Sequence, residues 1–107
     1  MIKRLVVLVA ILALTAGLAT AELRYTKLTS TTASGTTTIN AGTLLVINDG
    51  ASSIYVRVFW EGETAGDATA SNTEIKTGES MTFSKTTAVS AISVVSASSS
   101  TVRLVYW

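Results

Sequence analysis

The residues that could carry chemistry in this chain are few, because the sequence contains no histidine and no cysteine. This removes the most common general base, the thiolate nucleophile and the preferred ligands of zinc. Hydroxyl groups, amines and carboxylates remain as nucleophiles and bases. Ser84 and Lys85, for example, could form a serine–lysine dyad on paper, but neighbours on a strand point to opposite faces. The sequence therefore predicts a protein that is not an enzyme and holds no cofactor.

Three carboxylates lie in one long polar stretch without bulky apolar residues, at Glu61, Glu63 and Asp67. Calcium takes several oxygen ligands, and this stretch could supply three carboxylates together with backbone carbonyls. The spacing does not match the pattern of an EF-hand loop. We therefore keep these residues as a candidate calcium site, beside the alternative that they form an acidic loop that only aids solubility.

Aromatic and arginine side chains fall on the outer faces of two predicted strands. In residues 54–60 the side chains point alternately to the two faces of the strand. The face that carries Ile54, Val56, Val58 and Trp60 is predicted to point toward the core. The outward residues of this strand and of residues 101–107 are Tyr55, Arg57, Phe59, Arg103, Val105 and Trp107. Aromatic residues and arginine are enriched at the centres of interfaces. We expect these six residues to form a subunit or ligand surface, unless another segment of the chain covers them.

The elements that position these groups are short strands. Asn48-Asp49-Gly50 lies between two β-rich runs, and residues 44–60 are predicted to form a central hairpin. Further strands are expected along the whole chain, at residues 23–29, 36–39, 43–48, 73–77, 80–85, 88–97 and 101–107. The regular spacing predicts a single small antiparallel β-sandwich of about seven or eight strands over residues 22–107. The first strand could instead be donated to a neighbouring subunit.

Residues 1–21 have the composition of a secretory leader. Lys3 and Arg4 precede an unbroken apolar run, and Ala19-Thr20-Ala21 provides small residues at a cleavage position. The alternative is a retained hydrophobic helix that anchors the domain in a membrane, since the apolar segment is near the shortest length that spans a bilayer. Both interpretations predict a protein outside the cytoplasm, secreted or on a cell surface or virion.

Charge and composition limit the partners. The formal net charge is +1, and no basic cluster follows the leader, so no nucleic-acid partner is expected. Low charge gives little self-repulsion, which is compatible with a homo-oligomer. No disulfide can form, so the domain must rely on packing or on association.

Several turn and strand segments resemble small β-sandwich virion proteins of bacteriophages, of the head-decoration and fibre types. The matching segments are Asn48-Asp49-Gly50 and residues 54–58, 77–83 and 102–107. The resemblance covers roughly residues 36–107, and the leader departs from it, because head proteins of tailed phages are not normally exported. A virus with a membrane, or a cell-surface fibre, would accommodate both features.

The function expected from these observations is that of a non-enzymatic structural protein. It would be exported or membrane-anchored, and would assemble into or decorate a virion or cell-surface structure through homotypic packing. The alternative is a secreted adhesin or carbohydrate-binding module that uses the exposed aromatic side chains for stacking.

Overall fold

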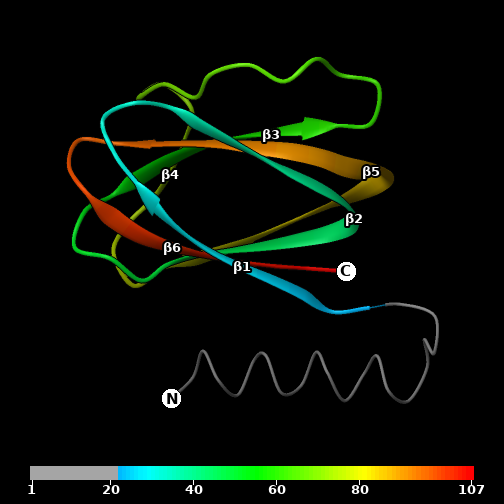
Figure 1. Cartoon of the computed structure of the whole chain (residues 1–107), viewed down its shortest axis with the longest axis horizontal. Helices are drawn as coiled ribbons and strands as arrows, with labels where there is room; N and C mark the ends of the chain where they lie inside the picture. The colour runs from blue at the N-terminus through cyan, green and yellow to red at the C-terminus, as the bar shows by residue number, and fades with distance from the viewer. Residues whose placement is uncertain (1–21) are drawn as a thin grey trace.

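The computed structural model describes residues 22–107, which form six antiparallel β-strands. They are β1 (Arg24–Ser30), β2 (Gly35–Asn48), β3 (Ile54–Trp60), β4 (Thr73–Ile75), β5 (Ser80–Ser96) and β6 (Ser100–Tyr106). The strands form one sheet in the order β1-β6-β2-β5-β3-β4, which curls into a half-barrel (Figure 1). The prediction of an all-β, antiparallel domain is confirmed.

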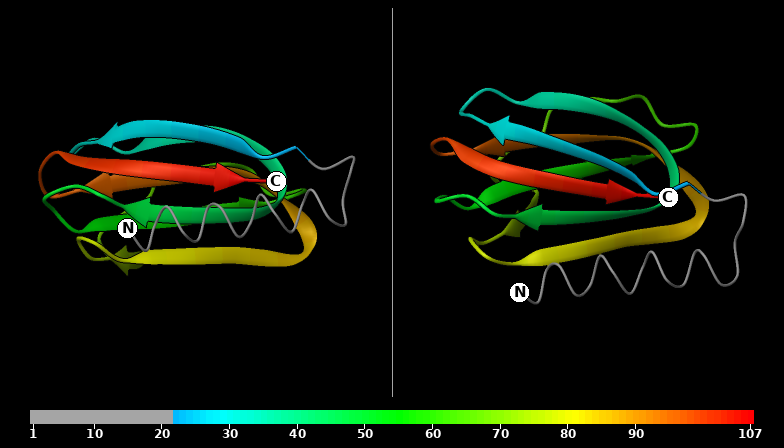
Figure 2. Two further views of the ribbon diagram at one scale, coloured as in Figure 1. Left: turned by 90° about the horizontal axis from the view of Figure 1, so that it is seen from below. Right: turned by 60° about the horizontal axis from the view of Figure 1, so that its bottom comes forward.

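The two long strands, β2 and β5, run through both sides of the half-barrel. Residues 35–41 of β2 pair with residues 89–94 of β5, and residues 43–47 pair with residues 80–84. The register shifts on both sides of Ala41, next to Asn40 at a φ of 52°. Asparagine tolerates this left-handed conformation, and irregular pairing bends a strand. The bend divides each strand into two halves on opposite sides of the half-barrel (Figure 2).

We call residues 80–87 the edge half of β5 and residues 89–96 its central half. The edge half lies in one layer with β1, β6 and the second half of β2. The central half lies in the other layer, between the first half of β2 and β3, with β4 beyond β3. Both layers contribute alternate side chains to the space between them.

That space is filled by one apolar cluster. Its largest fully buried side chains are Ile39, Leu44, Ile54, Ile75, Ile92 and Leu104. They come from five different strands, so the hydrophobic effect holds the two layers together rather than any single hairpin. Burying each such side chain contributes about 1.5–3 kcal/mol.

The strand number differs from the prediction of seven or eight. Residues 36–39 and 43–48 are parts of the single strand β2, and residues 80–85 and 88–97 fall within or next to the single strand β5. Asn40-Ala41-Gly42, between the first two segments, has the composition of a turn, whereas only Thr86 and Thr87 separate the second two. In the structure the backbone bends there without leaving the sheet.

The predicted central hairpin is wrong. β2 pairs with β5 and β6, while β3 pairs with β4 and β5, so the two strands around Asn48-Asp49-Gly50 do not pair with each other. The backbone N–H of Asn48 donates to Glu79 O, and that of Asp49 donates to Thr101 O. Both edges of β2 are thereby occupied, and the segment instead carries the chain from one layer to the other.

Two further expectations concern the beginning of the chain. β1 pairs along its full length with β6 of its own sheet, so it is not donated to a neighbour. The leader predicted at residues 1–21 lies outside the described residues. Within residues 22–107 no helix is long and apolar enough to cross a membrane.

Candidate functional site

The outer face of β3 is covered by the loop that follows the strand. Phe59 is only 2% exposed, and Ala68 of the loop is buried as well. The N–H of Ala68 donates to Ser34 Oγ at 3.0 Å, which fixes the loop across the sheet. Arg57 lies over the Phe59 ring and donates to the Asp67 carbonyl at 3.3 Å. The exposed aromatic row expected on this strand is therefore reduced to the exposed Arg57 and the half-buried Tyr55.

The outward side chains of β6 lie on the outer face of the other layer, the one formed with β1 and the second half of β2. Val105 is 2% exposed and forms a small apolar cluster with Leu45 and Ile47, against which Trp107 packs. The sequence alone gave no reason to expect Val105 to be buried, because the outward residues of β2 were not assigned to a face.

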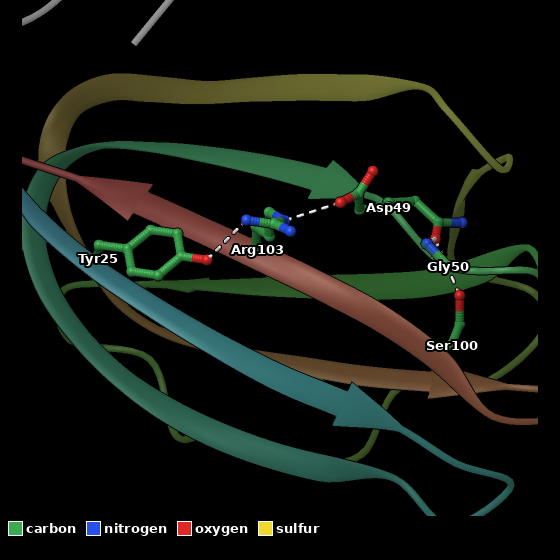
Figure 3. Close-up of polar contacts among 6 residues, drawn as sticks. Tyr25, Asp49, Gly50, Ser100 and Arg103 are labelled. Atoms are coloured by element: carbon green, nitrogen blue, oxygen red, sulfur yellow. Dashed lines mark hydrogen bonds and ion pairs between the residues drawn. The ribbon is translucent and has the colours of Figure 1, made fainter. Parts of the chain in front are cut away.

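Arg103 on the same face joins two segments through its guanidinium group (Figure 3). Its Nε donates to Asp49 Oδ2 at 2.8 Å, and its Nη1 donates to the Tyr25 hydroxyl at 3.2 Å. The hydrogen bond to Asp49 raises the pKa of Arg103 above its usual value. Arginine is charged in proteins in any case, so the effect of these contacts is to hold the guanidinium between Asp49 and Tyr25.

The two groups of predicted interface residues do not meet. β3 and β6 are separated in the sheet by β5 and β2, so the outer face of β3 and that of β6 belong to different layers. A single surface built from all six residues is ruled out by this order of strands. The role of each group in an interface stays a prediction.

The three loop carboxylates do not gather around one point. Glu63 Oε1 accepts the N–H of Trp60 at 2.7 Å, which is a local contact that ends β3. Asp67 contributes its backbone carbonyl to Arg57. Across residues 22–107 no group of three acidic side chains is placed to hold a metal ion.

Asn48 is a structural centre that the sequence suggested only as a turn residue. It is fully buried, and its Nδ2 donates to the carbonyls of Ser52 and Ile75 at 2.7 and 2.8 Å. Its Oδ1 accepts the Gly50 N–H and the Ser100 hydroxyl. At Gly50 an added Cβ would lie 2.2 Å from Thr101 N, so only glycine fits against β6. This network ties three loops together at one end of the half-barrel.

β3 pairs with β5 only from Val89 onward, so hydrogen bonds do not close the sheet between the end of β3 and the edge half of β5, and we call this the open side of the half-barrel. Lys85 Nζ is 4.6 Å from the centre of the Trp60 ring, so side chains from the two layers meet there. Val58, Trp60 and Phe83 are partly buried and pack against the core, and Met81 is 37% exposed. We call these four apolar residues the rim. Their inward direction was predicted by alternation, but their partial exposure at the open side was not.

Comparison with known proteins defines the fold. No protein-family model matches the sequence, and a search of curated proteins finds no match. A putative ethanolamine utilization protein Q from Salmonella typhimurium is similar in structure at 20% identity and a TM-score of 0.51. The match covers 81% of this chain and 58% of that protein.

A second similar structure is hydroxypropylphosphonic acid epoxidase from S. wedmorenis. It matches at 13% identity and a TM-score of 0.53, over 79% of this chain and 43% of the enzyme. Its complex with iron(II) and substrate matches at 15% identity and a TM-score of 0.54, over 79% and 45%. The chain thus spans about half the length of these structures. The shared element is a cupin-like β half-barrel.

These neighbours correct three expectations. The resemblance to phage virion proteins is wrong, because the similar folds are cupin-like. The expected function, a structural or adhesive surface protein, falls with it. The expectation that the chain is not an enzyme is also overturned, since the fold is shared with an epoxidase. It rested on the absence of histidine and cysteine, which removes their chemistry but leaves that of hydroxyl, amine and carboxylate groups.

Proposed function

We propose that this chain is an exported, cupin-like binding domain that takes a small apolar ligand at the rim. The observation that supports this is the contact of Lys85 with Trp60 at the open side. There the apolar filling of the half-barrel reaches the surface through Val58, Trp60, Met81 and Phe83. Ligand sites in proteins are typically concave and apolar, with few polar groups. Export is supported by the leader predicted at residues 1–21.

The residues present do not fit a metal centre of the kind suggested by the iron(II) complex of the epoxidase. The whole chain lacks histidine and cysteine, and the inner face of residues 22–107 is lined mainly by aliphatic and aromatic side chains. Carboxylates of the described segment do not cluster either. The proposal therefore uses only side-chain packing, with Lys85 as the polar group beside the ligand.

The two tryptophans of the chain provide the test, because Trp60 lies at the rim and Trp107 on the opposite face of the sheet. The probe is the neutral apolar dye N-phenyl-1-naphthylamine. We expect it to quench the fluorescence of Trp107→Phe, which retains Trp60, in a saturable manner. The matched variant Trp60→Phe should show little quenching. Equal quenching of the two variants, or none in either, would contradict the proposal.

A further inference from the structure

The edge half of β5 has a partner strand on one side only within residues 22–107. β2 pairs with it on that side, whereas β3 pairs with β5 from Val89 onward. Every residue of the edge half except Phe83 is exposed. In Figure 2 this segment, drawn in yellow, forms a margin of the sheet. A strand edge of this kind presents unpaired N–H and C=O groups to which another strand can add.

The turn before β5 shows which backbone groups are unpaired. The N–H of Gly78 donates to Asn48 O, and Asn48 N–H donates to Glu79 O, at 2.8 and 2.9 Å. Gly78 has a φ of 82°, so this is a bulge with glycine in the left-handed region. Glu79 thus directs its carbonyl toward β2. Since direction alternates along an antiparallel strand, Ser80, Thr82 and Ser84 direct their N–H and C=O groups away from β2.

The sequence of this edge is self-complementary in one register. If two copies pair antiparallel with Thr82 opposite the partner's Thr82, then Glu79 lies opposite the partner's Lys85. The same register places Met81 opposite the partner's Phe83, and Ser80 opposite the partner's Ser84. Opposite charges and apolar pairs that face each other across strands are stabilising. Thr82 is also one of the residues whose backbone groups point outward, as this register requires.

The edge formed by β1 differs in its charge. The Asp49 N–H donates to Thr101 O, and the Trp107 N–H donates to Thr43 O. The backbone groups of Thr101 and Trp107 are therefore directed toward β2. The even-numbered residues of β6 therefore direct their backbone groups toward β1 and pair with its even-numbered residues. The odd-numbered residues of β1 direct their backbone groups outward, away from the sheet. An antiparallel pair of β1 edges centred on the strand would bring Lys27 opposite the partner's Lys27. Like charges placed directly opposite destabilise a pair of strands, and edge lysines discourage pairing.

We infer that this protein forms a two-fold symmetric dimer in which the edge halves of β5 pair, centred on Thr82. The dimer joins one layer of each copy into a continuous sheet. Each copy contributes β1, β6, the second half of β2 and the edge half of β5 to it. An isologous contact of this kind closes on itself, so association stops at two copies. The inference concerns a second copy of the chain and does not rest on ligand binding at the rim.

The test measures the oligomeric state of the full chain in a mild non-ionic detergent by sedimentation over a wide range of concentrations. Thr82→Pro removes only an outward N–H, a position at which proline is tolerated on an edge strand. We expect Thr82→Pro to be monomeric where the unmodified chain is dimeric. Thr29→Pro makes the same change at an outward position of the β1 edge, and it should leave the dimer intact.

Charge variants test the register. Lys85→Glu places two pairs of like charges across the interface and should raise the dimer dissociation constant about tenfold. The double variant Glu79→Lys with Lys85→Glu restores opposite charges and should recover the dimer. An unmodified chain that is monomeric at every concentration overturns the inference. A dimer that survives Thr82→Pro overturns it as well, because the contact would then lie elsewhere, for example in the N-terminal segment. Failure of the double variant to recover would overturn the Thr82-centred register.

Discussion

The two halves of β5 have similar lengths and opposite surroundings. The central half lies between β2 and β3, and Ile92 and Val94 within it are at most 2% exposed. The edge half pairs with β2 alone, and Met81 within it is 37% exposed. One strand therefore supplies both the stabilising centre of the fold and its margin. The difference shows that burial of a strand depends on how many neighbours the fold gives it, and less on its own alternation.

The largest effect that separates the two halves is expected from Ile92→Ala. Ile92 is fully buried between the layers, and truncation leaves a cavity that the neighbouring strands cannot fill. The free energy of unfolding should fall by about 3 kcal/mol, measured by urea denaturation of the full chain. Ile92→Val removes a single methylene and should cost about 1 kcal/mol. A loss for Ile92→Ala no greater than that for Ile92→Val would mean that the central half is not the stabilising centre.

An intermediate effect is expected from Asn48→Ala, at the point where the end of β2 contacts the turn that precedes β5. The substitution leaves the Ile75 carbonyl and the Gly50 N–H without the partner that the Asn48 side chain provides, while the Ser52 carbonyl keeps the Ser100 hydroxyl. Unsatisfied buried groups should lower the free energy of unfolding by about 2–3 kcal/mol. Amide exchange should also become faster in the edge half, because the bond from Asn48 Nδ2 to the Ile75 carbonyl anchors the segment that leads into the Gly78 bulge.

Asn72→Ala is the matched control for Asn48. Asn72 accepts the Thr69 N–H within its own loop at 2.7 Å and has no role between strands. It should lower the free energy of unfolding by less than about 1 kcal/mol, with no change in exchange at residues 80–85. Equal effects of the two variants would show that the network around Asn48 does not position β5.

The smallest of the three main effects, the controls aside, is expected from Phe83→Ala in the edge half. Phe83 is only partly buried against the core, so the loss in free energy of unfolding should be about 1–2 kcal/mol, well below the range for a buried phenylalanine. The only other phenylalanine, Phe59, is 2% exposed under its loop and provides the comparison. Phe59→Ala should cost about 3 kcal/mol or more. A reversed order would mean that the edge half is covered in solution.

Much of the strand pattern follows from local sequence. Alternation predicts that Ile54 and Val56 face the core, and both are buried there. It also predicts the inward direction of Met81 and Phe83. These predictions succeed because the side-chain period of two is a property of the strand itself. The candidate site could be anticipated only to this extent, since its residues come from strands that are not adjacent in the sequence.

The pairing of strands could not be predicted in the same way. Asn48-Asp49-Gly50 has the composition of a hairpin turn, yet β2 and β3 do not pair because β5 and β6 occupy both edges of β2. Asn40-Ala41-Gly42 likewise has the composition of a turn, and the structure keeps β2 continuous through it. Local turn propensity is weaker than the free energy gained by burying an apolar face against a distant strand.

The sequence by itself determined the fold class, the inward faces of the strands and the absence of histidine and cysteine from the chemistry of the protein. These depend on residue types and on local periodicity. Only the tertiary structure decided that the sheet curls into a half-barrel, that the loop 61–72 covers Phe59, and that Lys85 meets Trp60 at an open side. These depend on contacts between segments far apart in the chain. Such contacts are selected by the packing of the whole core, and no short stretch of sequence encodes them.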